Sequence, residues 1–390
     1  MISAQVSIVR LNSYDPAKVD QALATLLEPF GGMKTFVQKT SYPIIKPNFL
    51  APKPADKATC THPEIIRGVA RILKDSGAQR PVLTDSPGVG TAEMCASKLG
   101  LSNDDTLMEI LNADDQTEYA LPDNSYNKLI LSKRMIEGGP LINLAKAKTH
   151  GHMVITAAAK NTFGAMVGMQ KAQFHFRCGK DAGKFARLLV SIHDLVAPVL
   201  NIVDAVVAME GNGPGSGTPR KLGILLAGTN AHAVDYALAQ IWGLEPEQVY
   251  TLDQAKQMGL LPTPNNISYP LVHPSEIILD SPWKQARPAL PKRMIGPNWM
   301  VPLFDKIMAL KPIVDSRCNG CQKCVAHCAA KAIELDEKDP VGRIKFNYKS
   351  CISCFCCQEV CPTGAIEAKS GLLASMLGLG NTTKKQTDKD

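Results

Sequence analysis

Two runs of closely spaced cysteines near the end of the chain constrain its fold more than any other feature. Each run has the spacing C-x2-C-x2-C-x3-C. This spacing is typical of a pair of [4Fe-4S] clusters, in which three cysteines of one run bind one cube and the fourth binds the other cube. The sequence therefore predicts one cluster on Cys318, Cys321, Cys324 and Cys361. It predicts a second cluster on Cys351, Cys354, Cys357 and Cys328.

Structural zinc and disulfide bonds are the alternatives for so many cysteines. Zinc prefers two CxxC pairs that lie well apart, which this double run does not resemble. A ninth cysteine, Cys356, stands beside Cys357, but only Cys357 keeps the spacing to Cys361. We therefore expect Cys356 to fill space as a small apolar side chain.

The two runs belong to an internal repeat. The segment from Cys328 to Glu334 recurs as the segment from Cys361 to Glu367, and each half is predicted to form a cluster loop, a short helical turn and a strand. Residues 313–369 resemble the two-cluster bacterial ferredoxins. A domain this small buries little apolar surface, so bound metal is expected to supply much of its folding free energy. Its expected role is one-electron transfer, with a redox partner protein.

Composition and charge exclude several classes of protein. The 390 residues carry a net charge of +7, but basic and acidic residues are interspersed, so nucleic-acid binding is not expected. No run of some 18 apolar residues predicts a membrane span. The remaining cysteines, Cys60, Cys95 and Cys178, are widely spaced, and the N-terminus lacks the features of a signal peptide. This pattern favours the reducing cytoplasm.

The first part of the chain alternates between strand and helix patterns. Residues 4–10 alternate as a strand, and Asp15 followed by Pro16 predicts the start of a helix. Further strands are expected near 43–46, 81–84, 141–144, 201–209 and 224–227, with helices between them. We expect an α/β fold with a largely parallel sheet and helices on both faces. The predicted domains are 1–280 (α/β), 281–312 (Pro-rich linker or docking segment), 313–369 (a small α+β ferredoxin-type domain) and 370–390 (flexible tail).

Polar residues follow several of the predicted strands. In open α/β sheets, ligands bind outside the carboxyl ends of the strands, so these residues mark a candidate cleft for a small anionic ligand. Lys148, His150 and Lys160 are the candidate catalytic residues. The candidate ligand-binding residues are Lys46, Asn48, His62, Asp85, Asn161 and Glu210.

Each of these residues also has a structural alternative. His62 before Pro63 is a good helix cap, Asn48 after Pro47 forms turns readily, and Asp85 suits the cap of a loop. The glycine-rich loop 211–217 can cradle an anion through its N–H groups or simply be flexible. A single metal ion on His62, His150, His152 or His175 is a further alternative, which no zinc-type spacing supports.

A collinear series of short motifs covers residues 5–275. The motifs are Lys46-Pro47-Asn48, Thr61-His62-Pro63-Glu64, Asp85-Ser86-Pro87, Ile142-Asn143-Leu144, Lys148-Thr149-His150, Lys160-Asn161-Thr162-Phe163-Gly164, Ile202-Val203-Asp204, Met209-Glu210-Gly211-Asn212-Gly213-Pro214 and Ala233-Val234-Asp235. Together they resemble domain-of-unknown-function family 362, whose members frequently carry an appended two-cluster ferredoxin module. The resemblance implies an iron–sulfur protein of oxidoreductase or ferredoxin type, without a defined substrate.

Three functions remain open from the sequence. In the first, the α/β cleft binds a small anion and exchanges electrons with it through the clusters, with His150 moving a proton. In the second, the chain is an electron carrier or redox-responsive binding protein without chemistry of its own. In the third, the α/β domain is a non-redox ligase or isomerase and the clusters are structural.

Overall fold

A mixed β-sheet forms the centre of the protein. The computed structural model describes residues 2–103, 106–121, 126, 128–168, 170–286 and 311–369. In this part of the chain the strands of the main sheet are β1 (Ala4–Arg10), β2 (Ile44–Pro47), β3 (Val82–Asp85), β4 (Glu109–Asn112), β7 (Leu141–His150), β8 (Val154–Thr156), β9 (Leu200–Glu210), β10 (Thr218–Gly228) and β11 (Ile267–Ser268). They follow the order β11-β1-β10-β9-β7-β2-β3-β4, with β8 paired to β7.

The central strands of this sheet are parallel. β9, β7, β2, β3 and β4 pair in parallel, so their carboxyl ends meet at one edge. We call the edge at which β2, β3, β7 and β9 end the carboxyl edge. β10 runs antiparallel to both β9 and β1, which makes the sheet mixed. A separate antiparallel pair is formed by β5 (Gln116–Tyr119) and β6 (Leu129–Ser132).

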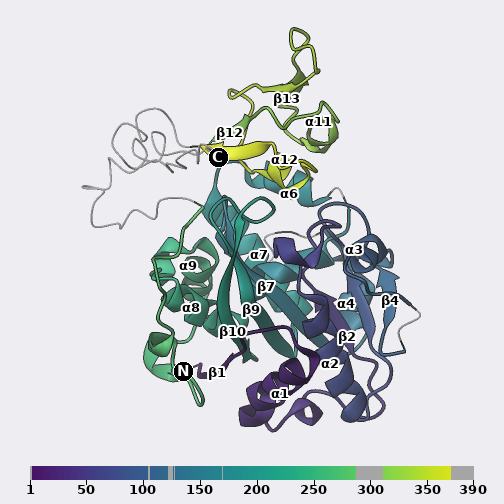
Figure 1. Ribbon diagram of the computed structural model, residues 1–390, viewed down its shortest axis with the longest axis vertical. Helices are drawn as coiled ribbons and strands as arrows, with labels where there is room; N and C mark the ends of the chain where they lie inside the picture. Colours follow the sequence, from purple (N-terminus) through teal and green to yellow (C-terminus); the bar gives the residue numbers. More distant parts are fainter. Residues whose placement is uncertain are drawn as a thin grey trace, which may run out of the picture.

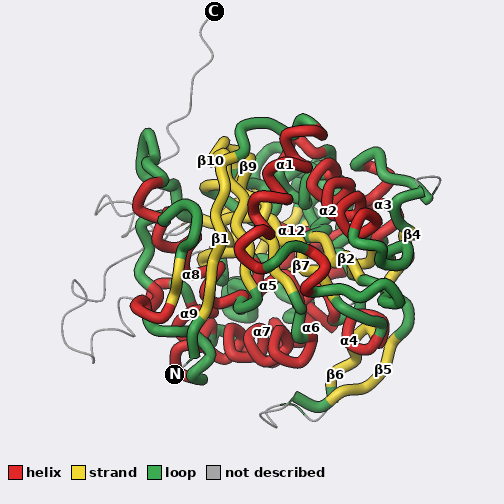
Figure 2. The backbone as a smooth tube through the Cα atoms, turned by 90° about the horizontal axis from the view of Figure 1, so that it is seen from below, coloured by secondary structure: helices red, strands yellow, loops and turns green. Residues whose placement is uncertain are grey.

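Helices cover both faces of the sheet, which confirms the α/β fold (Figure 2). One face is covered by α1 (Pro16–Leu27), α2 (Pro63–Asp75) and α3 (Ala92–Lys98). The opposite side carries α4 (Lys133–Glu137), α5 (Ala158–Asn161), α6 (Gln170–Cys178), α7 (Ala182–Val196), α8 (Ala231–Ile241) and α9 (Tyr250–Gln257).

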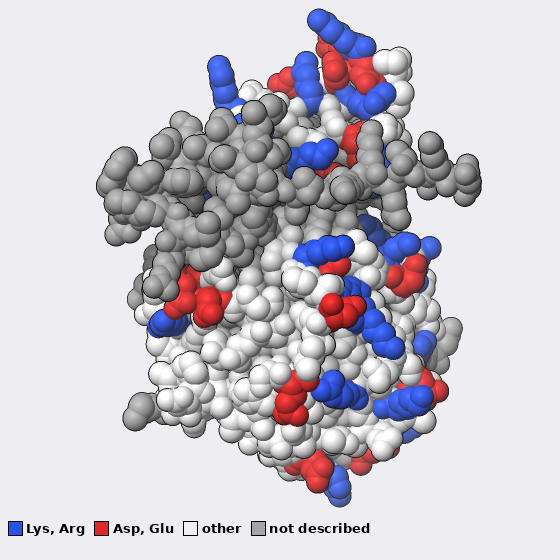
Figure 3. Space-filling view, turned by 60° about the vertical axis from the view of Figure 1, so that its left-hand side comes forward, with Lys and Arg blue, Asp and Glu red and all other residues white. Residues whose placement is uncertain are grey.

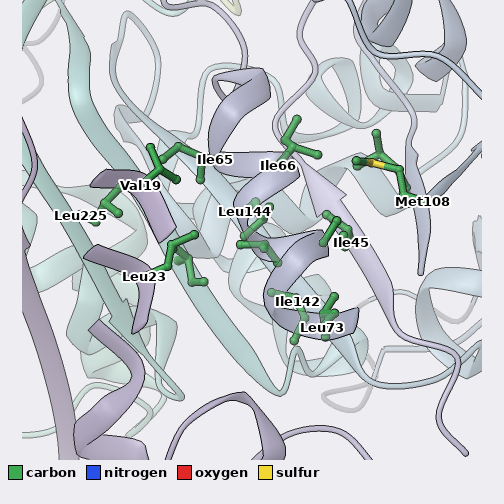
Figure 4. Close-up of a cluster of buried hydrophobic side chains, with 14 of the residues drawn as sticks. Val19, Leu23, Ile45, Ile65, Ile66, Leu73, Met108, Ile142, Leu144 and Leu225 are labelled. Carbon is green, nitrogen blue, oxygen red and sulfur yellow. The ribbon is translucent and has the colours of Figure 1, made fainter. Parts of the chain in front are cut away.

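The first helices begin where their capping residues predict. Asp15 accepts a hydrogen bond from the backbone N–H of Lys18 at 3.1 Å, and Pro16 occupies the first turn, where no N–H is needed. The apolar side chains of α1 and α2 then pack together against β2, β7 and β10 (Figure 4). Leu23 and Ile65 lie in this core with no exposed surface.

The C-terminal residues 311–369 form a small module with two short antiparallel strand pairs, which we call the cluster module. Its elements are β12 (Lys311–Val314), α11 (Lys323–His327), β13 (Ile333–Leu335), β14 (Ile344–Phe346), α12 (Cys356–Glu359) and β15 (Ile366–Lys369). Each half contains the loop, helical turn and strand expected from the repeat, and Ile333 and Ile366 share its core. The module lies over the carboxyl edge, with α12 close to α6 (Figure 1).

Two predicted segments fall largely outside this description. Residues 287–310 of the expected Pro-rich segment and the expected flexible tail 370–390 lie outside the described residues. On the face drawn in Figure 3, lysines and arginines are interspersed with aspartates and glutamates. Within the described ranges, every helix is too short or too polar to cross a membrane.

The core beneath α1 is expected to contribute strongly to stability. Leu23→Ala removes a fully buried side chain and should lower the free energy of unfolding by ~2–5 kcal/mol. Leu271→Ala is the matched control, because this leucine is 38% exposed, and it should change stability by less than about 0.5 kcal/mol. Chemical denaturation of the purified variants measures both values, and equal losses would contradict this account of the core.

Candidate functional site

The predicted polar residues come together at the carboxyl edge, where parallel strands end side by side. Lys46 lies in β2, Asp85 ends β3, and Lys148 and His150 lie two residues apart on β7. The strand expected at 141–144 continues to His150, so both of these side chains point to the same face. Lys46, Lys148 and His150 are at most 1% exposed, and Glu359 of the cluster module lies against His150.

Lys46 and Asp85 form a buried ion pair. Lys46 Nζ lies 2.8 Å from Asp85 Oδ1, and the other carboxylate oxygen accepts the backbone N–H of Phe49 at 2.9 Å. Burial lowers the pKa of Lys46, and the carboxylate of Asp85 opposes this effect. This ion pair holds the loops after β2 and β3 together. The Lys46 ammonium already has a carboxylate partner in Asp85 and is therefore not free to bind a ligand.

A chain of side-chain amides runs across the edge to Lys148. Lys148 Nζ donates to Asn48 Oδ1 at 2.6 Å, and Asn48 Nδ2 donates to Asn161 Oδ1 at 2.9 Å. Asn161 in turn donates to Asn143 at 2.7 Å, and Asn143 donates to Asn201 at 2.8 Å. All amides point the same way, so Asn48 is fixed as an acceptor toward the lysine. Burial lowers the pKa of Lys148 to about 7.

His150 links the sheet to the cluster module. Its Nδ1 accepts the backbone N–H groups of His152 and Met153 at 3.0 and 3.2 Å, so the neutral ring carries its proton on Nε2. Nε2 lies 3.2 Å from Glu359 Oε1, and neither atom has another hydrogen-bond partner in the described residues. Burial lowers the pKa of His150 to about 4, so the ring is neutral near pH 7.

Glu359 is a site residue that the sequence reasoning missed. It ends α12, between the predicted ligands Cys357 and Cys361. Burial raises its pKa, but the hydrogen bond from His150 and the charge of Lys160 outweigh this and lower the pKa to about 2. The sequence offered one signal for this residue: Glu359 is the only charged residue between Cys357 and Cys361.

Lys160 is half-buried and supplies a cation beside this carboxylate. Burial lowers its pKa, and the charge of Glu359 opposes that effect. Among the residues that the structure describes, its ammonium makes no hydrogen bond or ion pair; it lies 6.0 Å from the ring centre of Phe163. A cation in this position is available to a ligand.

Lys171 and His175 also reach this region from α6. Lys171 was not among the predicted site residues, and His175 was considered only as a ligand of a single metal ion. Lys171 Nζ donates to Ser86 Oγ at 2.9 Å and to the Ser86 carbonyl oxygen. Burial lowers the pKa of Lys171 to about 7 and the pKa of His175 to about 3. The region therefore contains four lysines, Lys46, Lys148, Lys160 and Lys171, and two carboxylates, Asp85 and Glu359.

His62 and Glu210 have contacts of another kind. His62 caps α2, accepting the N–H of Glu64 at 3.2 Å, and its ring stacks on Tyr14 with a centroid separation of 3.4 Å. Burial lowers the pKa of His62 to about 4. Glu210 pairs with Arg220 at 2.8 Å and accepts the N–H of Lys284 at 3.2 Å. These contacts hold α2 and residues 280–286 in place.

The glycine-rich loop 211–217 contacts the cluster module. Gln358 Nε2 donates to the Asn212 carbonyl oxygen at 3.2 Å, and the Ala368 N–H donates to Asn212 Oδ1 at 3.4 Å. The Gly151 N–H donates to the Gly213 carbonyl oxygen at 3.2 Å, which ties the loop to the end of β7. The loop therefore provides part of the surface on which α12 and β15 rest.

The conformation of the cluster module suits two iron–sulfur clusters. The two loops adopt positive φ angles at matching positions of the repeat, namely Gly320 and Ser353, Gln322 and Phe355, and Lys331 and Gly364. Backbone N–H groups also match: Ala332 donates to Cys328 Sγ and Ala365 to Cys361 Sγ, both at 3.3 Å. Donors directed at sulfur are a recurrent feature of cluster sites.

The predicted ligands of the second cluster line one cavity. Cys328, Cys351, Cys354 and Cys357 line one pocket that is partly open to solvent, and Cys356 and Ala172 of α6 also line it. In the described part of the chain, no three histidine, cysteine or carboxylate residues are arranged around a single metal ion.

Comparison with known proteins defines the class of this protein. Residues 317–365 match the family described as "4Fe-4S dicluster domain", which supports bound iron–sulfur clusters and electron transfer. Residues 44–240 match the family described as "Domain of unknown function (DUF362)". A thylakoid-associated protein of Synechocystis is 35% identical over 293 residues, which cover 73% of this chain and 89% of that protein. The chain belongs to the domain-of-unknown-function 362 family, as its motifs indicated.

Other similar proteins match parts of the chain. Pyruvate synthase subunit PorD of Methanocaldococcus jannaschii is 37% identical over 57 residues, 14% of this chain and 63% of that subunit. The lactate racemase apoprotein of Thermoanaerobacterium thermosaccharolyticum has a TM-score of 0.38 at 11% identity, covering 60% of this chain and 56% of that one. A Thermotoga maritima protein has a TM-score of 0.37 at 12% identity, covering 55% and 56%. The chain thus spans little more than half of either solved structure.

Gly164 is expected to be essential for the packing of the buried ion pair. An alanine Cβ there would overlap Asp85 Oδ1 and lie 2.6 Å from Lys46 Nζ, so Gly164→Ala should cost roughly 1–3 kcal/mol of stability. Gly183→Ala in α7 is the control, because its Cβ would lie no closer than 3.3 Å to a neighbour and alanine favours a helix. Thermal unfolding compares the two variants, and equal stability would refute the role of Gly164.

Proposed function

We propose that the chain is an iron–sulfur oxidoreductase that transfers electrons between two [4Fe-4S] clusters and a small anionic ligand at the carboxyl edge. The observation that carries this proposal is the 3.2 Å contact between His150 Nε2 and Glu359 Oε1. It joins the polar residues of the α/β fold to the turn between Cys357 and Cys361, which belong to different predicted clusters. A site built in this way places acid–base groups beside redox cofactors.

The predicted cysteine sets would hold the clusters. Cys318, Cys321, Cys324 and Cys361 would bind the first, and Cys351, Cys354, Cys357 and Cys328 the second; the matching loop conformations and the shared cavity support these sets. When bound, the clusters supply one-electron transfer. Cys356 remains the space-filling neighbour in this assignment.

The lysines and His150 have separate roles at the proposed site. Lys160 and Lys148 would bind the anionic group, because Lys160 is not engaged by another polar group described here and Lys148 is held by Asn48. His150 would hold a proton at Nε2, which its backbone contacts place there. Asn161 would orient Asn48, whereas the Lys46–Asp85 pair, His62 and Glu210 would support the surrounding loops.

The runner-up is an electron carrier or redox-responsive binding protein without chemistry of its own. It is favoured by the burial of Lys46, Lys148 and His150, which leaves them at most 1% exposed, and by the position of the cavity beside the second set of cysteines. A redox partner protein would then receive the electrons. Both functions require electron exchange with a partner, and only the first requires a ligand at Lys160.

The division of the chain and its location are part of the same proposal. The proposed division is an α/β domain 1–280, a Pro-rich linker or docking segment 281–312, a cluster domain 313–369 and a flexible tail 370–390. The separate hydrophobic cores of the two folded parts support the first and third of these. A cytoplasmic location is supported by the free cysteines of the described chain, which suit a reducing compartment.

The ligand proposal is tested by anaerobic reoxidation of reduced protein. A panel of 2-oxo and unsaturated carboxylic acids is titrated in, with inorganic phosphate as a non-reducible anion, and cluster absorbance is followed. We expect one acid class to reoxidise the clusters, with Lys160→Gln weakening its apparent affinity about 10-fold, because a charge-assisted contact is lost. Lys18→Gln, an exposed lysine of α1, should behave as wild type. Equal titrations for wild type, Lys160→Gln and His150→Ala would favour the carrier instead.

The cluster assignment is tested by iron analysis. Wild-type protein and Cys356→Ala should both contain about eight irons per chain, as expected for two cubes, whereas Cys321→Ala should lose about four. The loss should also lower the thermal stability of the cluster module, since bound metal contributes to its folding. Full iron content in Cys321→Ala, or a comparable loss in Cys356→Ala, would overturn the assignment.

A further inference from the structure

A groove lies where α6 of the α/β fold meets the cluster module (Figure 1). Its α6 side is formed by Gln173, Phe176 and Arg177, and Ala326 of α11 lines its other side. Cys328, a predicted ligand of the second cluster, lines it as well. The groove has a volume of about 360 Å³ and is open to solvent, so it can receive side chains of another molecule.

The two faces of α6 differ in their exposure. Phe174 and His175 are buried, at 3% and 4% exposed. Gln173, Phe176 and Arg177 are spaced by three and four residues, so they share the outer face of the helix. Phe176 is 50% exposed and is the only exposed phenylalanine in the described part of the chain. An exposed aromatic ring at the side of a groove is typical of residues that contribute strongly to binding another protein.

The charged side chains at this groove are cationic. Arg177 lines it, and Lys323 begins α11 three residues before Ala326, on the same side of that helix. The Arg177 guanidinium lies 4.9 Å from the ring centre of Phe174, and within the described residues neither Arg177 nor Lys323 pairs with a carboxylate. The described lining of the groove contains no carboxylate either. Two unpaired cations beside an exposed ring favour an acidic partner.

The position of Cys328 determines which cluster such a partner would reach. Cys328 lines both the groove and the pocket that contains Cys354 and Cys357. The other two residues that line both are alanines, Ala172 and Ala329. A molecule in the groove is therefore separated from the second cluster site by small side chains and one thiolate ligand, which keeps the distance for electron transfer short.

We propose that this groove is the docking site of a small acidic protein that carries single electrons. Carboxylates of the carrier pair with Arg177 and Lys323, and an apolar side chain packs against Phe176. One electron leaves the reduced carrier and reduces the cluster held in part by Cys328, and no covalent bond forms or breaks. The reverse transfer oxidises the cluster. The inference rests on the electron transfer in the proposed function, which the runner-up shares, and is independent of the small ligand.

Calorimetric titration of full-length, cluster-loaded protein with an oxidised acidic flavodoxin measures docking directly. We expect Phe176→Ser to weaken binding about 10-fold, because an aromatic contact at the interface is lost. The double variant Arg177→Gln/Lys323→Gln should also bind about 10-fold more weakly at low ionic strength. Its difference from wild type should shrink above about 0.5 M salt, where surface charges are screened. Basic cytochrome c should bind wild type more weakly than the flavodoxin does.

Leu271→Ser and Lys18→Gln are the matched controls, because both residues are exposed and lie outside α6 and the cluster module. Both variants should bind the flavodoxin as wild type does. Iron content and thermal unfolding are measured for every variant, so that affinities are compared between folded, cluster-loaded proteins. Absence of flavodoxin binding to wild type would overturn the inference, as would equal affinities of wild type, Phe176→Ser and the double variant.

Rapid mixing tests the transfer of electrons. Flavodoxin hydroquinone is mixed with oxidised protein, and oxidised flavodoxin with reduced protein, since one of the two directions must be favourable. The favourable direction should be slowed about 10-fold in Phe176→Ser and in the double variant under conditions in which the rate depends on carrier concentration. Absence of electron transfer in both directions would overturn the inference, even if the flavodoxin binds.

A photoreactive phenylalanine analogue in place of Gln173 identifies what occupies the groove. Irradiation with the flavodoxin present should give a one-to-one product of the two proteins. A product within the chain alone, or with a second copy of it, would overturn the inference. No small-molecule ligand is present in these experiments, so a failure to find a reducible acid for the proposed function leaves their outcome unchanged.

Discussion

The rest of the site depends on the packing of the cluster module against the carboxyl edge of the sheet. The contact places Glu359 against His150 and rests α12 on the loop that contains Asn212. Lys148 and Lys160 are buried near this contact, and their pKa values fall because a buried ammonium loses hydration. The α/β fold and the cluster module have separate hydrophobic cores, and these buried polar contacts join them.

Local patterns allowed much of the fold to be predicted. Capping by Asp15 and His62 marked the starts of α1 and α2, and strand ends located Lys46, Asp85 and His150 at one edge. These three residues could be located from the sequence because parallel strands place their carboxyl ends at the same edge of a sheet, whatever the intervening sequence. The cysteine spacing likewise identified the cluster module, because the ligands of each loop are close in sequence.

Long-range contacts were beyond this reasoning. The antiparallel pairing of β10 with β9 depends on how the chain turns after Glu210, and an alternating pattern alone does not fix strand direction. Glu359 and Lys171 join the site only because the cluster module and α6 pack over the edge.

The row of amides from Asn201 to Asn48 has a consequence for how the edge responds to change. Every member both gives and receives a hydrogen bond, and Asn201 donates onward to the carbonyl oxygens of Gly228 and Thr229. Rotating one amide by half a turn would set oxygen against oxygen and nitrogen against nitrogen at its neighbours. The whole row must therefore reverse together or remain as it is, so the turn after β10 determines whether Asn48 presents its oxygen or its nitrogen to Lys148.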